Sequence, residues 1–250
     1  MMSNRIWSIA LIALSAWLTG FAPAQEAPPA QQGASPAQEE YTLKLQPKEG
    51  DTFKYRFTME LTFGEQSAVV TMNISSKVIK VDADGNIVIE SGSSDGMVKF
   101  GEQEMPIPPS PATRTTFKPN GMPVKVEGGN NPDVSLRMAR LNAQFFPDKP
   151  VKIGDKWDAE LKGEGSAPPL KANFELVAKE KVGDIETLKI KFTIQEIGEK
   201  VEGGAATLTG HLWIDPKTGM LVRMNGSVKG MPAEGAPMPL DGTLTMERIP

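Results

Sequence analysis

The residue types that usually carry catalysis are scarce in this chain. It has one histidine, His211, and no cysteine, which excludes a catalytic Cys/His couple, a zinc site of standard ligands and a disulfide framework. Residues 92–96 match G-x-S-x-G around Ser94, but a nucleophile elbow requires a strand-turn-helix context and a histidine base. Residues 97–100 have the pattern of a strand, so we interpret Ser94 as part of a polar loop. We interpret His211 as a solvated residue on the polar face of a strand.

Three oxygen-bearing residues match the opening of a calcium-binding loop. Asp82, Asp84 and Asn86 have the spacing of the first three ligands, but Ser93 stands where a bidentate glutamate is expected. A tight turn is therefore the better interpretation. No spacing among the acidic residues predicts the carboxylate pair of a glycosidase. We therefore expect that the protein is not an enzyme.

Several methionines are candidate ligands of a soft metal ion. Met105, Met231 and Met238 lie in loops rich in Gly, Pro and Ala, and thioether sulfur can bind Cu(I). Copper-handling segments usually carry denser methionines, and methionine commonly fills gaps in a core. We expect neither a metal nor another cofactor.

The N-terminus has the pattern of an export signal. Arg5 precedes an apolar run over residues 6–21, and residues 22–24 (Ala-Pro-Ala) supply the small residues of a cleavage site. This predicts a signal peptide over residues 1–24 and an extracytoplasmic protein, periplasmic or secreted. Residues 25–40, rich in Ala, Pro, Gln and Gly, are predicted to be a flexible linker. The formal charge of −4, without a Lys/Arg cluster, favours neither nucleic acid nor anionic lipid as a partner.

The remaining residues, 41–250, are predicted to form strands almost throughout. Residues 53–63 alternate strictly between large apolar and polar side chains, and residues 68–74, 170–176 and 188–194 repeat this alternation. One buried and one wet face per strand is typical of an antiparallel sheet.

One segment departs from the alternation. Residues 131–146 begin with Asn-Pro-Asp and carry apolar residues at helical spacing, which predicts one amphipathic helix that covers part of the apolar face. The fold class is therefore mainly β: a large curved antiparallel sheet or half-barrel with one helix.

Two sequence patterns recur in the same order. Residues 48–53 (KEGDTF) are echoed by 152–157 (KIGDKW), and residues 117–126 by 213–224. This predicts two copies of one β unit, at about 41–128 and 149–250, joined by the helix. The echoed aromatics, Phe53 and Trp157, either form a stacking platform for a sugar or peptide or close the two ends of the core; we favour the second interpretation.

Residues 150–157, the one-helix all-β pattern and the turn at residues 215–219 (DPKTG) resemble a family of secreted bacterial proteins known as a domain of unknown function. More distantly, the chain is similar to half-barrel lipoprotein carriers of the LolA and LppX type. The resemblance implies a concave sheet that holds acyl chains, although those carriers have more helices than this sequence predicts.

The primary hypothesis is a non-catalytic binding or carrier protein of the cell envelope with an apolar concave surface. Its predicted lining residues are Phe57, Met59, Leu61, Phe174, Leu176, Ile190 and Phe192. The alternative is a structural or protein-interaction module with a filled core, which docks an envelope protein through the loops at residues 105–111 and 231–239. An open apolar cavity of a few hundred Å³ or more would favour the carrier, and a filled core would favour the module.

Overall fold

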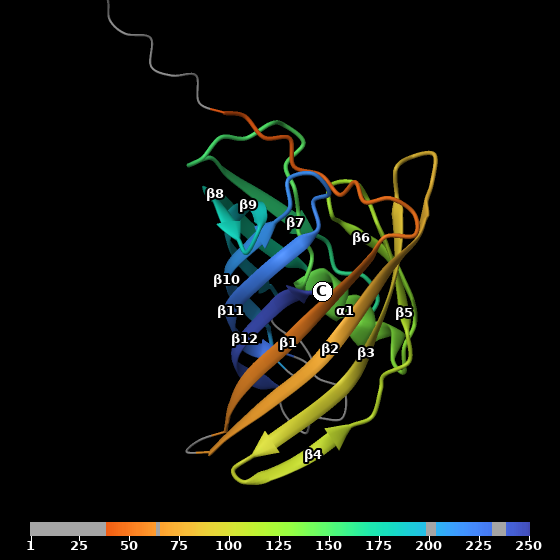
Figure 1. Cartoon of the computed structure of the whole chain (residues 1–250), viewed down its shortest axis with the longest axis vertical. Coiled ribbons are helices and arrows are strands. Elements are labelled where there is room, and N and C mark those ends of the chain that lie inside the picture. Colours follow the sequence, from red (N-terminus) through yellow and green to blue (C-terminus); the bar gives the residue numbers. More distant parts are fainter. Residues whose placement is uncertain (1–38, 64–65, 199–203, 232–238) are drawn as a thin grey trace, which may run out of the picture. The chain divides into compact units, whose positions relative to one another are not determined.

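The computed structural model describes residues 39–63, 66–198, 204–231 and 239–250, and this part of the chain contains twelve strands and one helix (Figure 1). The predicted signal peptide and almost all of the predicted linker lie outside the described residues. The strands are β1 (Thr52–Phe63), β2 (Gln66–Val81), β3 (Ile87–Phe100), β4 (Gln103–Ile107), β5 (Thr113–Phe117), β6 (Pro123–Gly128), β7 (Lys156–Leu161), β8 (Leu170–Val182), β9 (Ile185–Glu196), β10 (Thr207–Ile214), β11 (Leu221–Met231) and β12 (Leu240–Ile249). The helix α1 (Pro132–Leu141) lies between β6 and β7 in the chain.

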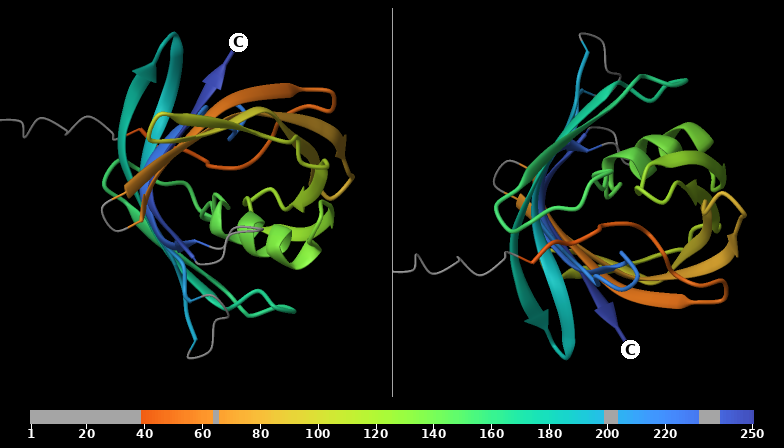
Figure 2. Two further views of the ribbon diagram at one scale, coloured as in Figure 1. Left: turned by 90° about the horizontal axis from the view of Figure 1, so that it is seen from below. Right: turned by 90° about the horizontal axis from the view of Figure 1, so that it is seen from above.

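All twelve strands belong to one antiparallel sheet with the order β6-β5-β3-β2-β1-β12-β11-β10-β9-β8-β7, and β4 pairs with β3 beside this path. The sheet therefore consists of two meanders, β1–β6 and β7–β12, joined where β1 pairs with β12. It curves around α1, which lies on its concave side (Figure 2). The prediction of a mainly β fold with a large curved antiparallel sheet is confirmed.

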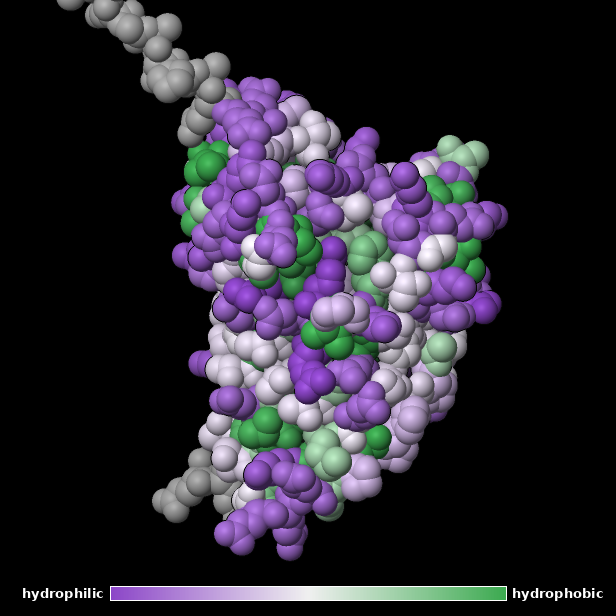
Figure 3. All heavy atoms as spheres, viewed as in Figure 1, coloured by the Kyte–Doolittle hydropathy of each residue, from purple (hydrophilic) through white to green (hydrophobic). Residues whose placement is uncertain are grey.

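The alternation of side chains explains why β1 has one wet and one apolar face. Tyr55, Met59 and Leu61 are buried, whereas Arg56 and Glu60 between them are exposed. Figure 3 views the molecule from the outer side of β1 and β2, where hydrophilic side chains dominate the surface. The apolar sets of these strands therefore face the concave side.

The helix begins where the sequence predicts but is shorter than residues 131–146. The side chain of Asn131 caps it by accepting hydrogen bonds from the N–H groups of Asp133 and Val134. The helix ends at Leu141, five residues earlier than predicted, and Asn142 is its C-cap. The predicted C-terminal boundary is therefore wrong.

A turn of the first meander explains this early end. The N–H of Phe146 donates to the carbonyl of Asn120 (2.8 Å) rather than to a helical partner. Gly121 approaches the chain so closely that a Cβ atom there would lie 1.9 Å from the carbonyl oxygen of Gln144. This docking draws residues 142–146 out of the helix and buries Phe145 and Phe146 in the core.

The echoed sequence patterns form turns with matching hydrogen bonds. Gly50 and Gly154 each have positive φ and each donate from their N–H to a carbonyl of the second strand of their meander (2.9 and 2.7 Å). Asp51 and Asp155 each accept, at their side chains, from the N–H three residues earlier (2.9 and 2.8 Å). That the two meanders are copies of one unit stays a prediction, which superposing residues 45–127 on 149–226 would test.

Candidate functional site

A cavity of about 770 Å³ lies between the inner face of β1–β3 and the helix α1. Most of its wall is made of apolar side chains, because each strand presents alternate residues to the concave side. The strands and the β4 hairpin contribute Phe57, Met59, Leu61, Ala68, Val70, Met72, Val98, Phe100, Met105, Ile107, Met231 and Leu240. The helix contributes Val134, Ser135 and Met138, so α1 forms the opposite wall rather than filling the space.

The structure places the seven predicted lining residues in two different regions. Phe57, Met59 and Leu61 line this cavity; Met59 and Leu61 are buried and Phe57 is partly buried. The other four residues lie in the packed core under β8 and β9. They are Phe174, Leu176, Ile190 and Phe192, each at most 4% exposed.

Aromatic packing explains why the second region is filled. Phe174 stacks on Trp157, with ring centroids 5.6 Å apart and planes at 13°, and lies 6.2 Å from the ring of Phe145. The indole N–H of Trp157 donates to the carbonyl of Phe145 (2.7 Å). Trp157 also forms part of the wall of a mixed polar and apolar cleft of about 570 Å³ at the edge strand β7.

Phe53 and Trp157 do not share a platform. They lie on β1 and β7, which are separated by five strands of the sheet. Both pack against the hydrophobic core. That they close the two ends of the core stays a prediction.

Five methionines line the 770 Å³ cavity: Met59, Met72, Met105, Met138 and Met231. Met59 was predicted to line the site, and Met105 and Met231 were considered only as ligands of a soft metal. Met72 and Met138 were not predicted as site residues, although they belong to the alternating pattern of β2 and to the helical spacing of α1. Met238 lies outside the described residues. Methionine side chains are flexible and polarisable, so this wall can adapt to apolar molecules of different shape.

A second cavity, of about 240 Å³, adjoins the same strands. The polar residues of its wall are Tyr55, Ser76, Ser91, Asn142 and Gln144. The hydroxyl of Tyr55 donates to the carbonyl of Leu221 (3.2 Å), and burial raises the pKa of Tyr55 to about 12 although Arg248 acts in the opposite direction.

Gln144 Oε1 is buried and accepts no hydrogen bond from any residue that the structure describes. The hydroxyl oxygens of Ser76 and Ser91 lie 2.8 Å apart and share one hydrogen bond. Gln144 falls within residues 131–146, which the sequence predicted to be helical, and neither serine was among the predicted site residues.

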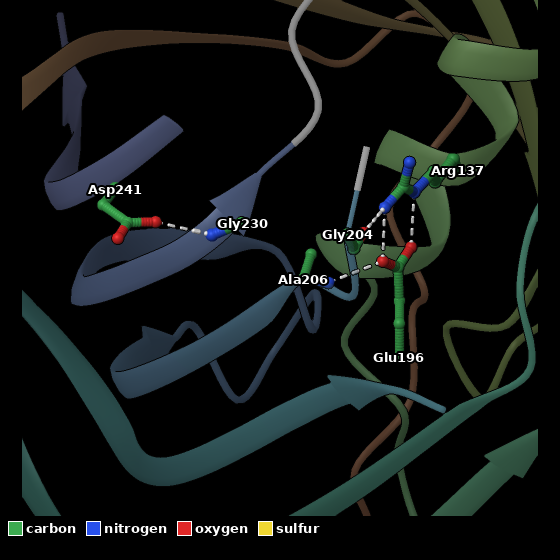
Figure 4. Close-up of polar contacts among 6 residues, drawn as sticks. All are labelled: Arg137, Glu196, Gly204, Ala206, Gly230 and Asp241. Atoms are coloured by element: carbon green, nitrogen blue, oxygen red, sulfur yellow. Dashed lines mark hydrogen bonds and ion pairs between the residues drawn. The ribbon is translucent and has the colours of Figure 1, made fainter. Parts of the chain in front are cut away.

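An ion pair fixes the helix to the far meander (Figure 4). The guanidinium of Arg137 makes two hydrogen bonds of 2.6 Å to the carboxylate of Glu196 at the end of β9, and a third of 2.8 Å to the carbonyl of Gly204. Glu196 also accepts from the N–H of Ala206 (2.7 Å), and its side chain is 1% exposed. This bidentate contact holds one side of α1 against β9 and the segment before β10.

A second arginine of the helix is buried with fewer partners. Arg140 donates to the carbonyl of Lys162, but its Nε and Nη1 atoms meet no acceptor among the described residues. Burial lowers the pKa of Arg140, while Glu164 and Glu196 act in the opposite direction. Arg140 is not part of the wall of the cavities described above.

Ser94 and His211 do not form a catalytic arrangement. Ser94 is exposed within β3, where it donates to Asp95, and no helix follows it; the prediction of a loop is wrong because residues 87–100 continue as one strand. His211 is partly buried on β10, beside Trp213 (6.1 Å between centroids). Burial first, and then Lys189 and Lys191, lower its pKa.

The calcium-like segment is a turn closed by its own side chains. Asp82 accepts from the backbone N–H groups of Asp84 and Asn86 and from the Asn86 side chain (2.8–3.0 Å). The pKa of Asp82 is lowered, mainly by the Asn86 side chain. Within the described ranges, no group of three or more His, Cys, Asp or Glu side chains could hold a metal ion.

No helix within residues 39–63, 66–198, 204–231 and 239–250 has the length and hydropathy needed to span a membrane.

Comparisons with known proteins give little that bears on function. No protein-family model and no curated protein matches the chain. Among solved structures, the chain is similar to a Bacteroides fragilis protein that is described as presumed to be exported and as having a YmcC-like fold. The two are 11% identical with a TM-score of 0.35, and the match covers 84% of this chain and 100% of that one. A likeness at this level carries no argument about activity or ligand.

Proposed function

We propose that this protein is a non-catalytic binding or carrier protein of the cell envelope, which holds an apolar ligand between β1–β3 and α1. The observation that carries the proposal is the 770 Å³ cavity, whose wall is apolar and rich in methionine. Ligand sites of small molecules in proteins have volumes of roughly 300–1,000 Å³ and mostly apolar walls. A cavity of this size favours a carrier over a module with a filled core.

The site of action and the nature of the ligand are further parts of this proposal. The predicted signal peptide supports export, with cleavage near Ala24. The resemblance to half-barrel lipoprotein carriers supports an acyl chain or a similar apolar group as cargo. Phe57, Met59 and Leu61 would contact this group, whereas Phe174, Leu176, Ile190 and Phe192 would support the site from the packed core.

Two adjacent valines on β2 allow a matched test. Val70 lines the cavity, and Val69 belongs to the opposite face of the same strand. Val70→Phe should therefore fill part of the cavity, while Val69→Phe should leave it unchanged. We expect the native protein and Val69→Phe to bind the apolar fluorescent probe diphenylhexatriene, and Val70→Phe to bind it at least about ten-fold more weakly.

The measurement is probe fluorescence on titration of each purified protein, after circular dichroism has shown that each variant is folded. A native protein that binds no probe would contradict the proposal. Equal binding by Val70→Phe and Val69→Phe would place the probe elsewhere on the molecule and would also contradict it.

A protein-interaction module remains the second candidate, and the exposed β4 hairpin favours it. Met105 is 53% exposed and Phe100 is 36% exposed, although both also border the cavity. Contiguous exposed apolar side chains mark docking surfaces. This candidate gains support if the native protein takes up no apolar probe, and it would then be tested by substituting Met105.

A further inference from the structure

The strand β7 ends the sheet, and its outer edge is open. β7 pairs with β8 on one side, and no residue that the structure describes pairs with its other side. The cleft of about 570 Å³ lies beside this edge and is lined by every residue from 155 to 161. The backbone of β7 is therefore accessible to another strand.

The hydrogen bonds between β7 and β8 show which backbone groups point outward. The N–H of Leu176 donates to the carbonyl of Asp155 (3.0 Å), so these two residues form a hydrogen-bonded pair of the antiparallel ladder. Such pairs alternate along a ladder. The N–H and C=O groups of Lys156, Asp158 and Glu160 therefore point away from β8 and form the free edge.

The other edge of the sheet is protected in ways that β7 is not. β6 begins with Pro123, which has no N–H to donate, and its register with β5 shifts between Thr116 and Phe117. β7 contains no proline, and its register with β8 is continuous. Prolines and bulges hinder the pairing of an edge strand with another chain, so β7 is the edge that can accept a further strand.

The outer face of β7 carries charges of both signs. The apolar side chains of this strand pack against the core, so Lys156, Asp158 and Glu160 lie on the outer face. On β8, Glu175 forms an ion pair with Lys156 (3.6 Å), and Lys171 forms one with Glu160 (3.3 Å). Charges at an edge repel another strand only where like charges meet, so the register of pairing decides their effect.

Two copies of β7 have two long registers in which they can pair antiparallel. Because the outward-pointing residues must meet in the hydrogen-bonded pairs, the two-fold axis lies at Asp158 or at Ala159. An axis at Ala159 sets Asp158 against the partner's Glu160 on both sides, which brings like charges together twice. An axis at Asp158 sets Lys156 against the partner's Glu160 on both sides, which brings opposite charges together twice. Charge therefore favours the axis at Asp158.

One pair of like charges remains in this register, Asp158 against the partner's Asp158. The amide of Asn173 on β8 donates to the carboxylate of Asp158 (2.6 Å), which holds the carboxylate on the side away from the free edge. On the inner face, Trp157 lies opposite the partner's Ala159, whose small side chain leaves room for the indole ring. The favoured register is thus compatible with the side chains on both faces.

The same register continues the ion pairs between β7 and β8. The order across the outer face becomes Glu175, Lys156, the partner's Glu160 and the partner's Lys171, so that the charges alternate in sign. We propose that the protein forms a two-fold symmetric dimer in which β7 pairs antiparallel with β7 of a second copy, with the axis at Asp158. Because a two-fold contact closes on itself, the assembly stops at two copies. The dimer does not depend on a ligand in the cavity between β1–β3 and α1.

Cysteine cross-linking tests the register, because the native chain has no cysteine. Residues of a hydrogen-bonded antiparallel pair have Cα atoms about 5.5 Å apart, so a short bismaleimide should link Asp158→Cys into a dimer. Lys156→Cys alone should link poorly, since the two copies of residue 156 lie roughly 14 Å apart along the strands. A mixture of Lys156→Cys and Glu160→Cys should link well. Glu127→Cys, on the edge strand β6, is the control and should not link.

Sedimentation equilibrium of charge variants tests the same contact without a cross-linker. Glu160→Lys sets like charges together on both sides of the axis, so it should weaken the dimer at least about ten-fold. Adding Lys156→Glu to this variant restores opposite charges across the axis and should recover most of the affinity. Asp158→Asn removes the remaining pair of like charges and should strengthen the dimer about three-fold. Glu127→Lys, which breaks an ion pair with Lys125 on β6, is the matched control and should leave the dimer unchanged.

Every substitution lies at an exposed position, and circular dichroism would verify that each variant is folded. A native protein that stays monomeric at the highest attainable concentration would overturn the proposal. A dimer that Glu160→Lys leaves intact, or that links equally well through Glu127→Cys, would overturn the assignment to β7. Efficient linking of Lys156→Cys alone, with none in the mixture with Glu160→Cys, would overturn the axis at Asp158.

Discussion

The inner faces of β1–β3 and of β8–β10 alternate in the same way, yet one lines a cavity and the other is filled. Leu176 and Ile190 on the second face are at most 1% exposed, whereas Phe57 and Val70 on the first are only partly buried and border 770 Å³ of open space. The difference lies in what stands opposite each face. Alternation decides which side of a sheet is apolar, but the opposing chain decides whether that side becomes core or site.

The helix and its C-terminal segment are those opposing elements. Residues 142–146 bring Phe145 and Phe146 against the β7–β8 side, where Phe145 contacts Phe174. The helix itself lies across from β1–β3 and is held by Arg137 at Glu196. We expect that breaking this ion pair would change both the stability of the filled region and the shape of the cavity. A substitution confined to one region should change the properties of that region alone.

The largest effect should follow from removing Glu196. Glu196→Ala leaves the guanidinium of Arg137 and the N–H of Ala206 without their shared partner in a buried place. Breaking one side of such a pair costs about 3–5 kcal/mol. Denaturant unfolding should show this loss in the free energy of unfolding.

The double variant Arg137→Met with Glu196→Leu provides the control. It removes both charges together, so it should recover much of the stability lost in the single variant. A single variant as stable as the native protein would show that the helix is held by apolar packing alone.

The next effect contrasts leucines of the two regions. Leu176→Ala, in the filled region, should lower the free energy of unfolding by about 2–5 kcal/mol, because a fully packed site leaves a cavity. Leu240→Ala removes the same atoms from a partly buried cavity wall, so it should cost about 1 kcal/mol or less. Similar losses in chemical denaturation would contradict the division into a filled and an open region.

The sequence predicted the positions of the strands better than it predicted which chain segments pack against them. The period-two pattern of residues 53–63 identified β1 and its inward face, and Asn131 identified the start of the helix, because both signals are local. The end of the helix has no local signal in the sequence, since it depends on the docking of Phe146 onto Asn120. For the same reason, Phe57 and Phe174 were indistinguishable in the sequence, although only Phe57 lines the cavity.

A smaller, pH-dependent effect concerns Tyr55, whose hydroxyl joins β1 to the start of β11. Its pKa is raised from 10.0 to about 12 by burial, so the native state retains a proton that the unfolded state loses. Stability from this group is complete below pH 10 and is lost as the pH rises towards 12, by roughly 3 kcal/mol in all. Tyr55→Phe should flatten this alkaline loss in unfolding experiments.

The other tyrosine of the chain supplies the control for this titration. Tyr41 is less buried than Tyr55, so Tyr41→Phe should keep most of the alkaline loss. If Tyr55→Phe loses as much stability at alkaline pH as the native protein, other groups must cause the loss.

The smallest effect on stability should come from Phe57→Leu, which contrasts most directly with Phe174→Leu. Phe57 borders open space, so its shortening should change the free energy of unfolding by less than about 1 kcal/mol and alter probe affinity several-fold. Phe174 loses its stacking on Trp157, so its replacement should cost about 1–3 kcal/mol and leave probe affinity unchanged. Unfolding and probe titration of the same two variants would measure both quantities. The opposite pattern, with Phe174→Leu changing probe affinity and Phe57→Leu changing stability, would place the site on the inner face of β8–β10 instead.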